Sequence, residues 1–286
     1  MRFTIRPLKT IDEYHACEAL QRQAWPMDDD LEVVPLHLLL SVHKNGGLLL
    51  GAFDGDDMVG FVFGHPGLTA EGRPKHCSHM MGVRPGLQGA GIGYQLKLAQ
   101  RQAALEQGLD LVTWTYDPLL SRNAYLNLHK LGTVSRAYLP DCYGPLNDGL
   151  NAGLPTDRFD VEWWIASPWV QRRLAGQVDE PLPGPAVQAN RTRHTAAGFL
   201  EPGALTLEAG AATVLVEIPD DYQAVKAAVP ALALEWRQAT CQLFEFYFAA
   251  GYTVVDLLSQ QIDGERRSFY VLWANWKEWF EQETGV

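Results

Sequence analysis

The stretch VRPGLQGAGIG, residues 83–93, decides how the rest of the chain is interpreted. A strand-like segment, residues 75–83, precedes it, and a segment with helical spacing of its apolar residues, 89–107, follows it. Within the stretch, Gly89, Gly91 and Gly93 alternate with other residues. Glycines let the backbone bend tightly and approach a ligand without a clashing Cβ, and the amides at a helix start attract an anion. The stretch therefore predicts a phosphate-binding loop, for which a pyrophosphate is the natural ligand.

Two other glycine-rich phosphate loops do not fit these residues. A dinucleotide fingerprint, G-x-G-x-x-G, would need its third glycine at Tyr94. A Walker loop ends in Gly-Lys followed by Ser or Thr, and the stretch has no such ending. A nucleotide-binding oxidoreductase is therefore the least favoured function. The structural alternative is a glycine-rich turn that only packs a helix on a sheet.

The pattern that fits is Q-x-x-G-x-G, Gln88 to Gly93, preceded by V-x-P, Val83 to Pro85. It resembles the pyrophosphate loop of the GNAT (GCN5-related N-acetyltransferase) superfamily. A second segment, residues 121–132, resembles the later GNAT helix, in which an Asn commonly meets the pantetheine arm and a Gly ends the helix. The resemblance covers roughly residues 1–140 and implies acetyl-CoA or another acyl-CoA as co-substrate, with no metal. The cofactor-binding residues that it implies are Met81, Val83, Gln88, Gly89, Ala90, Gly91, Ile92, Gly93 and Asn123.

The order of the predicted elements, strands alternating with helices, favours a mixed α/β sheet. The resemblance implies a GNAT-like, mostly antiparallel sheet flanked by helices, with a smaller α/β carboxy-terminal region. We expect an acyl-CoA-binding domain at 1–180 and a carboxy-terminal domain at 181–286, because residues 177–204 contain four prolines and suggest a linker or an extended excursion. A helix that ends in Gly before a strand occurs at 122–134 and again at 241–254. The second copy is either a degenerate half-repeat or a coincidence, and neither predicts a second cofactor site.

The resemblance also implies where the donor lies. In this superfamily the strand before the loop separates from the strand that follows the next helix. Backbone groups around residues 80–83 would then pair with the pantetheine amides as an added strand would. The thioester would lie near Tyr116, Asp117 and Asn123.

The catalytic residues are less clear from the sequence. Many GNAT enzymes use a Tyr four residues before the helix-ending Gly as the acid for the leaving thiolate, and here Leu128 stands at that position. The replacement acids that we consider are the neighbouring tyrosines Tyr125, Tyr138 and Tyr143. For each of these tyrosines, packing or a surface position is the competing interpretation.

A base is also needed, and two histidines precede the loop. His76 and His79 are three residues apart on one strand, so they face opposite sides of the sheet, and at most one points toward the thioester. A neutral imidazole there would accept a proton from the amine, and His79 is the candidate that we retain. Asp117 is a further candidate, although Asp-Pro is also a common turn. Cys77 and Cys142 are less favoured, because direct transfer from a thioester needs no covalent intermediate.

The resemblance implies that the acceptor is a small amine, with amino acids among the candidates. Arg136 and Arg158 are the residues that we expect to bind a carboxylate partner, because arginine forms a bidentate fork with carboxylates. A local ion pair with Asp157 is the alternative for Arg158. The run YGPLNDGLNAGLPTDR, 143–158, resembles a longer bacterial GNAT subgroup linked to N-acylation of amino acids, sometimes with succinyl donors. A coenzyme A-binding sensor with little catalytic activity is the runner-up function, and Leu128 is its main support.

Composition sets the remaining expectations. The net charge of −11 argues against a nucleic-acid surface, which needs clustered Lys and Arg. The four scattered cysteines favour a reduced, cytoplasmic chain rather than a disulfide scaffold or a metal site. No apolar run approaches the ~20 residues that span a bilayer, so we expect no membrane partner. A homodimer is compatible with the sequence.

Overall fold

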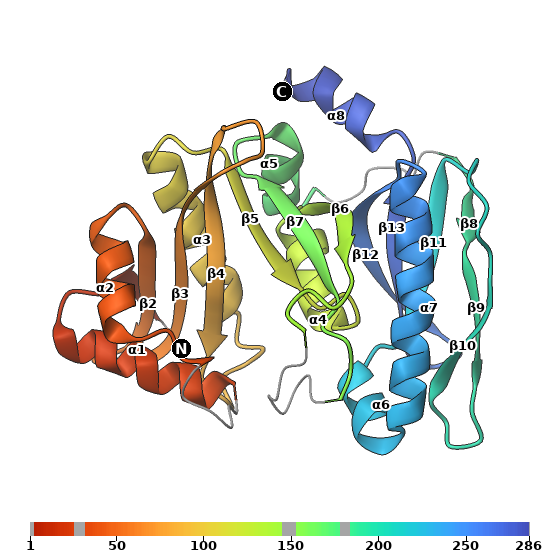
Figure 1. Cartoon of the computed structure of the whole chain (residues 1–286), viewed down its shortest axis with the longest axis horizontal. Coiled ribbons are helices and arrows are strands. Elements are labelled where there is room, and N and C mark those ends of the chain that lie inside the picture. The colour runs from red at the N-terminus through yellow and green to blue at the C-terminus, as the bar shows by residue number, and fades with distance from the viewer. Residues whose placement is uncertain (1–2, 26–31, 145–152, 178–183, 286) are drawn as a thin grey trace. The chain divides into compact units, whose positions relative to one another are not determined.

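The computed structural model describes residues 3–25, 32–144, 153–177 and 184–285 (Figure 1). Among these residues, contacts divide the chain into two compact units, one up to Trp114 and the other from Thr115 onward. The boundary expected between residues 180 and 181 lies outside the described residues. The mixed α/β class, with a largely antiparallel sheet and helices, is confirmed.

The first unit contains five strands in the order β1-β2-β3-β4-β5. The pairs from β1 to β4 are antiparallel, and β4 and β5 are parallel. The last two residues of β5 belong to the second unit. The elements are β1 (Thr4–Pro7), α1 (Ile11–Ala24), α2 (Leu36–Lys44), β2 (Leu48–Asp54), β3 (Asp57–Leu68), β4 (Pro74–Val83), α3 (Ile92–Glu106) and β5 (Leu111–Tyr116).

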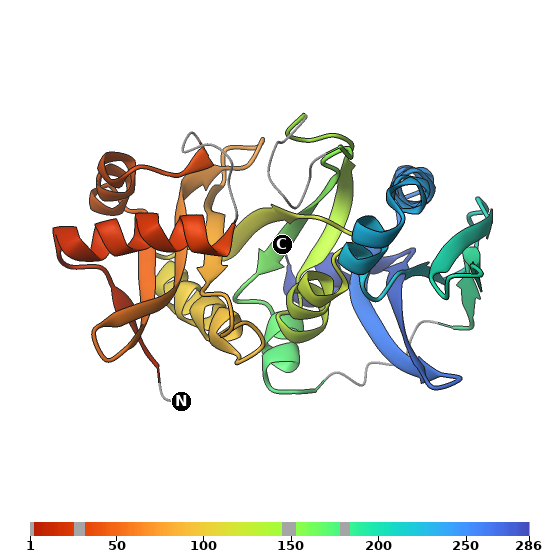
Figure 2. The same cartoon turned by 90° about the horizontal axis from the view of Figure 1, so that it is seen from below.

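Helices cover both faces of this sheet, with α1 and α2 on one face and α3 on the other (Figures 1 and 2). Alternation along the strands explains the arrangement, because successive side chains point to opposite faces. On β2, Leu49 and Phe53 join the cluster with α1 and α2, whereas Leu50 and Ala52 join the cluster with Ile92 of α3 and its neighbours. Because these strands are buried on both faces, they fix the position of β4 and of the loop that follows it.

The second unit contains β7, β6, β12, β13, β11 and β8 as neighbours in that order, and a separate pair, β9 and β10. Residues 125–130 form a π-helix, η2, directly after α4. The elements are α4 (Ser121–Ala124), η2 (Tyr125–Lys130), β6 (Val134–Leu139), β7 (Arg158–Trp164), α5 (Pro168–Leu174), β8 (Ala186–Gln188), β9 (Asn190–His194), β10 (Leu200–Leu205), β11 (Thr213–Ile218), α6 (Tyr222–Ala228), α7 (Pro230–Ala249), β12 (Thr253–Ile262), β13 (Glu265–Trp273) and α8 (Trp276–Thr284).

The two segments that end a helix in Gly have the same local plan. Gly132 and Gly251 both have positive φ, and each precedes an antiparallel hairpin, β6-β7 or β12-β13. Strands β6 and β12 pair with each other, so the order β7-β6-β12-β13 mirrors itself about that pair. Thr133 and Thr253, the residues after the two glycines, are both fully buried. The half-repeat stays a prediction.

The described part of the proline-rich segment, which was expected to be a linker or an extended excursion, forms strands of the second unit. This part, residues 184–204, contains β8, β9 and most of β10. Contacts with β11 hold these residues in place, because the Asn190 side chain exchanges two hydrogen bonds of 2.8 Å with the backbone of Glu217. Neither local composition nor the prolines reveal such a non-local pairing.

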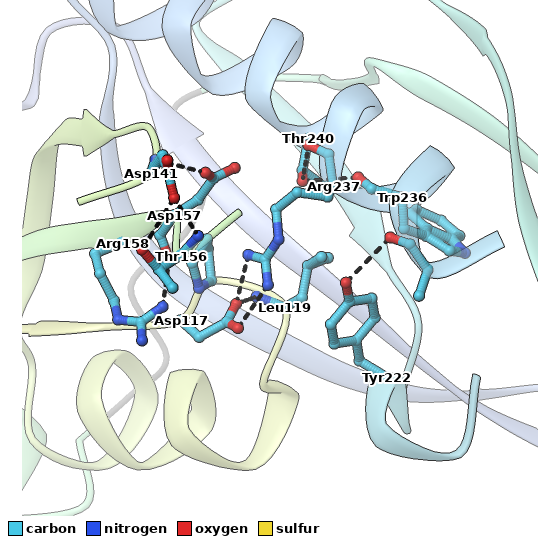
Figure 3. Close-up of polar contacts among 12 residues, drawn as sticks. Asp117, Leu119, Asp141, Thr156, Asp157, Arg158, Tyr222, Trp236, Arg237 and Thr240 are labelled. Atoms are coloured by element: carbon cyan, nitrogen blue, oxygen red, sulfur yellow. Dashed lines mark hydrogen bonds and ion pairs between the residues drawn. The ribbon is translucent and has the colours of Figure 1, made fainter. Parts of the chain in front are cut away.

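A buried ion pair ties α7 to the residue after β5 within the second unit (Figure 3). Both terminal nitrogens of Arg237 donate to the Asp117 carboxylate, at 2.8 and 2.7 Å, and the two side chains are 3% and 8% exposed. Asp117 also accepts from the amide of Leu119 at 2.9 Å. Two charges removed from water in this way stabilise the fold only as a pair.

We predict that Arg237→Met lowers the free energy of unfolding by about 3–5 kcal/mol, because it leaves the Asp117 carboxylate buried without its partner. Arg266→Met, which breaks the exposed ion pair with Asp220, is the matched control and should cost about 0–1 kcal/mol. Chemical denaturation of both variants measures the difference. Equal losses would show that the buried pair does not hold α7.

Candidate functional site

The loop between β4 and α3 takes the conformation that its glycines allow. Gly89 and Gly91 have φ of 87° and 83°, in the region that residues with a Cβ avoid. Gly91 is the N-cap of α3, where it places no side chain over the helix start, and the first turn contains no acidic residue. The first-turn amides of a helix have no partner within the helix and attract anions. The geometry expected for an anion-binding loop is therefore present.

Space beside the loop is open. A Cβ built on Gly89 or Gly91 would meet no protein atom within 4 Å, whereas one on Gly93 would lie 3.4 Å from Cε of Met81. Residues 88–91 are exposed, and Ile92, which is 1% exposed, anchors the start of α3 in the sheet. A ligand can therefore approach the amides of this loop directly.

An ion pair fixes the chain as it enters the loop. Both terminal nitrogens of Arg84 donate to Asp57, at 2.5 and 2.7 Å, and one also donates to the carbonyl of Met58 at 2.7 Å. The Arg84 amide donates to the carbonyl of Val59 at 2.9 Å. These contacts join the end of β4 to the start of β3, and they fix the position at which the loop begins.

Strand β4 has a partner along one side and only a short partner along the other. It pairs with β3 along its whole length, but with β5 only at His76↔Val112 and Cys77↔Thr113. From Ser78 onward, β4 pairs with no described residue of β5. Backbone groups on that edge are available to an extended ligand, as in strand addition.

A bulge interrupts β4 in the same region. Met80 pairs with Phe63 and Ser78 pairs with Gly64, which leaves His79 without a residue opposite it in β3. The ring of His79 contacts the rings of Phe63 and His65, at centroid distances of 5.9 and 6.2 Å. Phe63 belongs to the cluster on the α1 and α2 face, so His79 points to that face.

His76 points to the opposite face, as the alternation predicted, and it is fully buried. Its Nε2 lies 3.0 Å from Nε2 of Gln100 on α3, so Nε2 accepts and the proton of the neutral ring is on Nδ1. That Nδ1 has no hydrogen-bond partner in the described part of the chain. Burial, with smaller contributions from Lys97 and His65, lowers the pKa of His76 to about 3. A group this hard to protonate is unsuited to accept a proton near neutral pH.

Beside His76, α3 places Lys97, a residue that no motif in the sequence marks as functional. Nζ of Lys97 donates to Oγ of Ser78 at 2.8 Å and to Oε1 of Gln100 at 3.2 Å. It lies 3.6 Å from the ring centroid of Trp114 on β5. The only signal in the sequence is position, because Lys97 directly follows the inward-facing Leu96.

The remaining candidates lie in the second unit. The hydroxyl of Tyr138 donates to Asp157 at 2.5 Å, and burial, followed by the charge of Asp157, raises its pKa above the usual range. The hydroxyl of Tyr143 lies 2.7 Å from that of Thr115, on an exposed side chain. Leu128 is fully buried, and Asn123 is exposed on α4.

The two arginines expected to bind a carboxylate also have partners in this unit. Nη2 of Arg136 donates to both carboxylate oxygens of Glu162, at 2.7 and 2.8 Å. Arg158 is 9% exposed and donates to the carbonyl of Asp157 at 2.9 Å (Figure 3). It also lies 5.2 Å from the ring centroid of Tyr143. Arg158 thus contacts the backbone of Asp157.

Comparisons with known proteins find similar solved structures. They include the ribosomal-protein-S18-alanine N-acetyltransferase of Escherichia coli (14% identity, TM-score 0.45, covering 57% of this chain and 94% of that one) and a GNAT-family acetyltransferase of Streptococcus pneumoniae (16%, 0.46, 56% and 98%). A third is a chain of the NatC complex bound to Gag peptide and CoA (15%, 0.46, 57% and 98%). No family model and no curated protein matches the sequence. At such identities and TM-scores we base the function on the loop and on β4, not on these neighbours.

Among the described residues, no group of three or more His, Cys, Asp or Glu side chains is arranged to hold a metal ion. No helix among them has the length and apolar character to cross a membrane.

Proposed function

We propose that this protein is a GNAT-type N-acyltransferase that moves an acyl group from acyl-coenzyme A to the amine of a small molecule. The observation that carries the proposal is a single strand, β4, that has an unpaired edge and ends in an open, glycine-built anion loop. Coenzyme A has the two matching parts in the same order, a pyrophosphate and an arm with two amides. The loop takes the first part, and the strand edge takes the second.

The pyrophosphate binds at Gln88–Gly93. Its charge is balanced by the amides and the dipole of α3 rather than by a lysine, which suits a chain with a net charge of −11. Gly89 and Gly91 face open space, so the phosphate oxygens reach the backbone directly. Met81 and Val83, at the end of β4, flank the start of the arm.

The arm runs back along β4, and its amides pair with the strand edge that β5 leaves free. Its chain of bonds is about as long as four extended residues, roughly 13 Å. An arm that starts beside Gly82 or Val83 therefore ends beside Ser78 and His79. The thioester then lies at the bulge, where the backbone amide is a candidate donor to the oxyanion of the tetrahedral intermediate.

His79 is the base of this proposal. It is exposed on the face of α1 and α2, and partial burial, together with the nearby charge of His65, lowers its pKa below the usual range. It is therefore neutral at neutral pH and can accept the proton that the attacking amine loses. Attack on the thioester carbonyl is direct, with no acyl-enzyme.

The acyl group is acetyl or succinyl, and the acceptor is a small amine, with amino acids as the first class to test. Three further roles stay predictions: a pantetheine contact for Asn123, the acid for Tyr138 or Tyr143, and a carboxylate contact for Arg136 and Arg158. The competing function is a coenzyme A-binding sensor, which the fully buried Leu128 in the usual position of the acid favours.

Thiol release separates these functions. Acetyl-CoA and succinyl-CoA are incubated with the protein and a panel of amino acids and polyamines, and free thiol is measured. An enzyme releases thiol with at least one amine. Tight acyl-CoA binding without acceptor-dependent thiol release supports the sensor, and the absence of any thermal shift with either acyl-CoA at saturation rejects both.

We predict that Gly89→Asp weakens coenzyme A binding about tenfold or more relative to Gly89→Asn. Both side chains tolerate a positive φ better than most and have nearly the same shape, so strain is matched and only the charge differs. The added carboxylate repels the pyrophosphate at close range. Calorimetric titration with coenzyme A checks this, and equal affinities would place the pyrophosphate elsewhere.

We predict that His79→Gln lowers kcat/KM by about 10²–10⁴-fold while the affinity for acetyl-CoA stays unchanged. In the wild type, kcat/KM falls as the pH drops through the lowered pKa of His79, because the protonated ring cannot accept a proton. This acidic limb should disappear in the variant. His194→Gln, an exposed histidine of the second unit, is the control, and an equal loss there would count against His79 as the base.

A further inference from the structure

Lys97 is a buried ammonium group without an acidic partner. Its side chain is 3% exposed, and its contacts are the hydroxyl of Ser78, the amide oxygen of Gln100 and the ring of Trp114. None of the partners that the described residues provide is a carboxylate. Burying a charge in this way is costly, and a leucine or methionine would fill the same space without that cost.

The surroundings of Lys97 favour loss of its proton. Burial lowers the pKa of Lys97 to about 7. The titratable group that faces it from β4 is His76, which is neutral, and Trp114 faces it from β5. The residues that β2 and β3 pack on the same face of the sheet are apolar, namely Leu50, Ala52, Val59 and Val62.

The position of Lys97 relates it to the site proposed above. Cys77 is the last residue of β4 that pairs with β5, and Ser78 is the first beyond it. Nζ of Lys97 lies 2.8 Å from Oγ of that same Ser78. A pantetheine arm laid along β4 from the loop brings its sulfur to this point, beside the lysine.

We propose that Lys97 is the catalytic acid that protonates the leaving thiolate of coenzyme A. Many GNAT enzymes use a tyrosine for this step, and Leu128 stands at its position here. The role of Lys97 rests on the proposed function. The amine nitrogen bonds to the thioester carbon, and the proton that it loses passes to His79. The carbon–sulfur bond breaks with its electron pair on sulfur, and a proton moves from Nζ of Lys97 to sulfur, which leaves as the thiol. Water that enters after coenzyme A departs returns a proton to the amine.

The test compares Lys97→Met with the wild type, using acetyl-CoA and the amine that gives the fastest thiol release. We expect kcat to fall about 10²–10⁴-fold with unchanged affinity for coenzyme A. In the wild type, kcat falls as the pH rises and Lys97 loses its proton, and this alkaline limb should be absent from the variant. The variant should melt at or above the wild-type temperature, because it removes a buried charge. Lys75→Met, on the same strand as Ser78, should keep the wild-type kcat and pH profile.

Three outcomes overturn the proposal. An unchanged kcat with an unchanged alkaline limb in Lys97→Met means that another group protonates the sulfur. A loss confined to succinyl-CoA, with acetyl-CoA turned over normally, means that Lys97 is a counter-ion for a carboxylate on the acyl group. A wild type that releases no thiol with any amine rejects the proposed function itself, and Lys97 with it. The first two outcomes leave the acyltransferase intact.

Discussion

The candidate site in the first unit depends on the point at which β4 stops pairing with β5, after Cys77. Backbone amides and carbonyls inside a sheet need hydrogen-bond partners, and an exposed edge invites pairing by another chain. Most proteins cover such an edge, but among the described residues β4 pairs with β5 at only two positions and continues to the glycine loop without a strand on that side. The bulge at His79 lies on the same stretch. One divergence of two strands thus creates an extended surface for amides, beginning beside Ser78 and ending at the helix start.

The two units treat buried charge in opposite ways. Arg237 and Asp117 form a bidentate pair that satisfies both charges, which is what a structural role requires. Lys97 is as deeply buried, but its contacts within the described part of the chain are a hydroxyl, an amide and an aromatic ring. Because charge without a counter-ion destabilises a fold, its retention is more readily explained by chemistry than by packing. The contrast is between a buried charge with a carboxylate partner and one without such a partner among the described residues.

The same reasoning separates the two histidines. His76 and His79 differ little in sequence, since both precede the loop on one strand. In the structure one is sealed beneath α3 and bonded to Gln100, and the other stands exposed at the bulge beside His65. Alternation predicted that they face opposite sides. How deeply the helices bury each face at these positions depends on residues far away in the chain, so only the folded sheet separates the buried His76 from the exposed His79.

What the sequence determined by itself is the loop at residues 83–93 and the order of the elements around it. The positive φ of Gly89 and Gly91 and the open start of α3 are local properties, fixed within a few residues by the absence of a Cβ and by unpaired first-turn amides. The tertiary structure alone decided the strands within residues 184–204, the place where β5 leaves β4, and the burial of Lys97 against Ser78. These depend on pairing between distant segments, and a lysine among helical residues looks like any surface lysine until the strand opposite it is known.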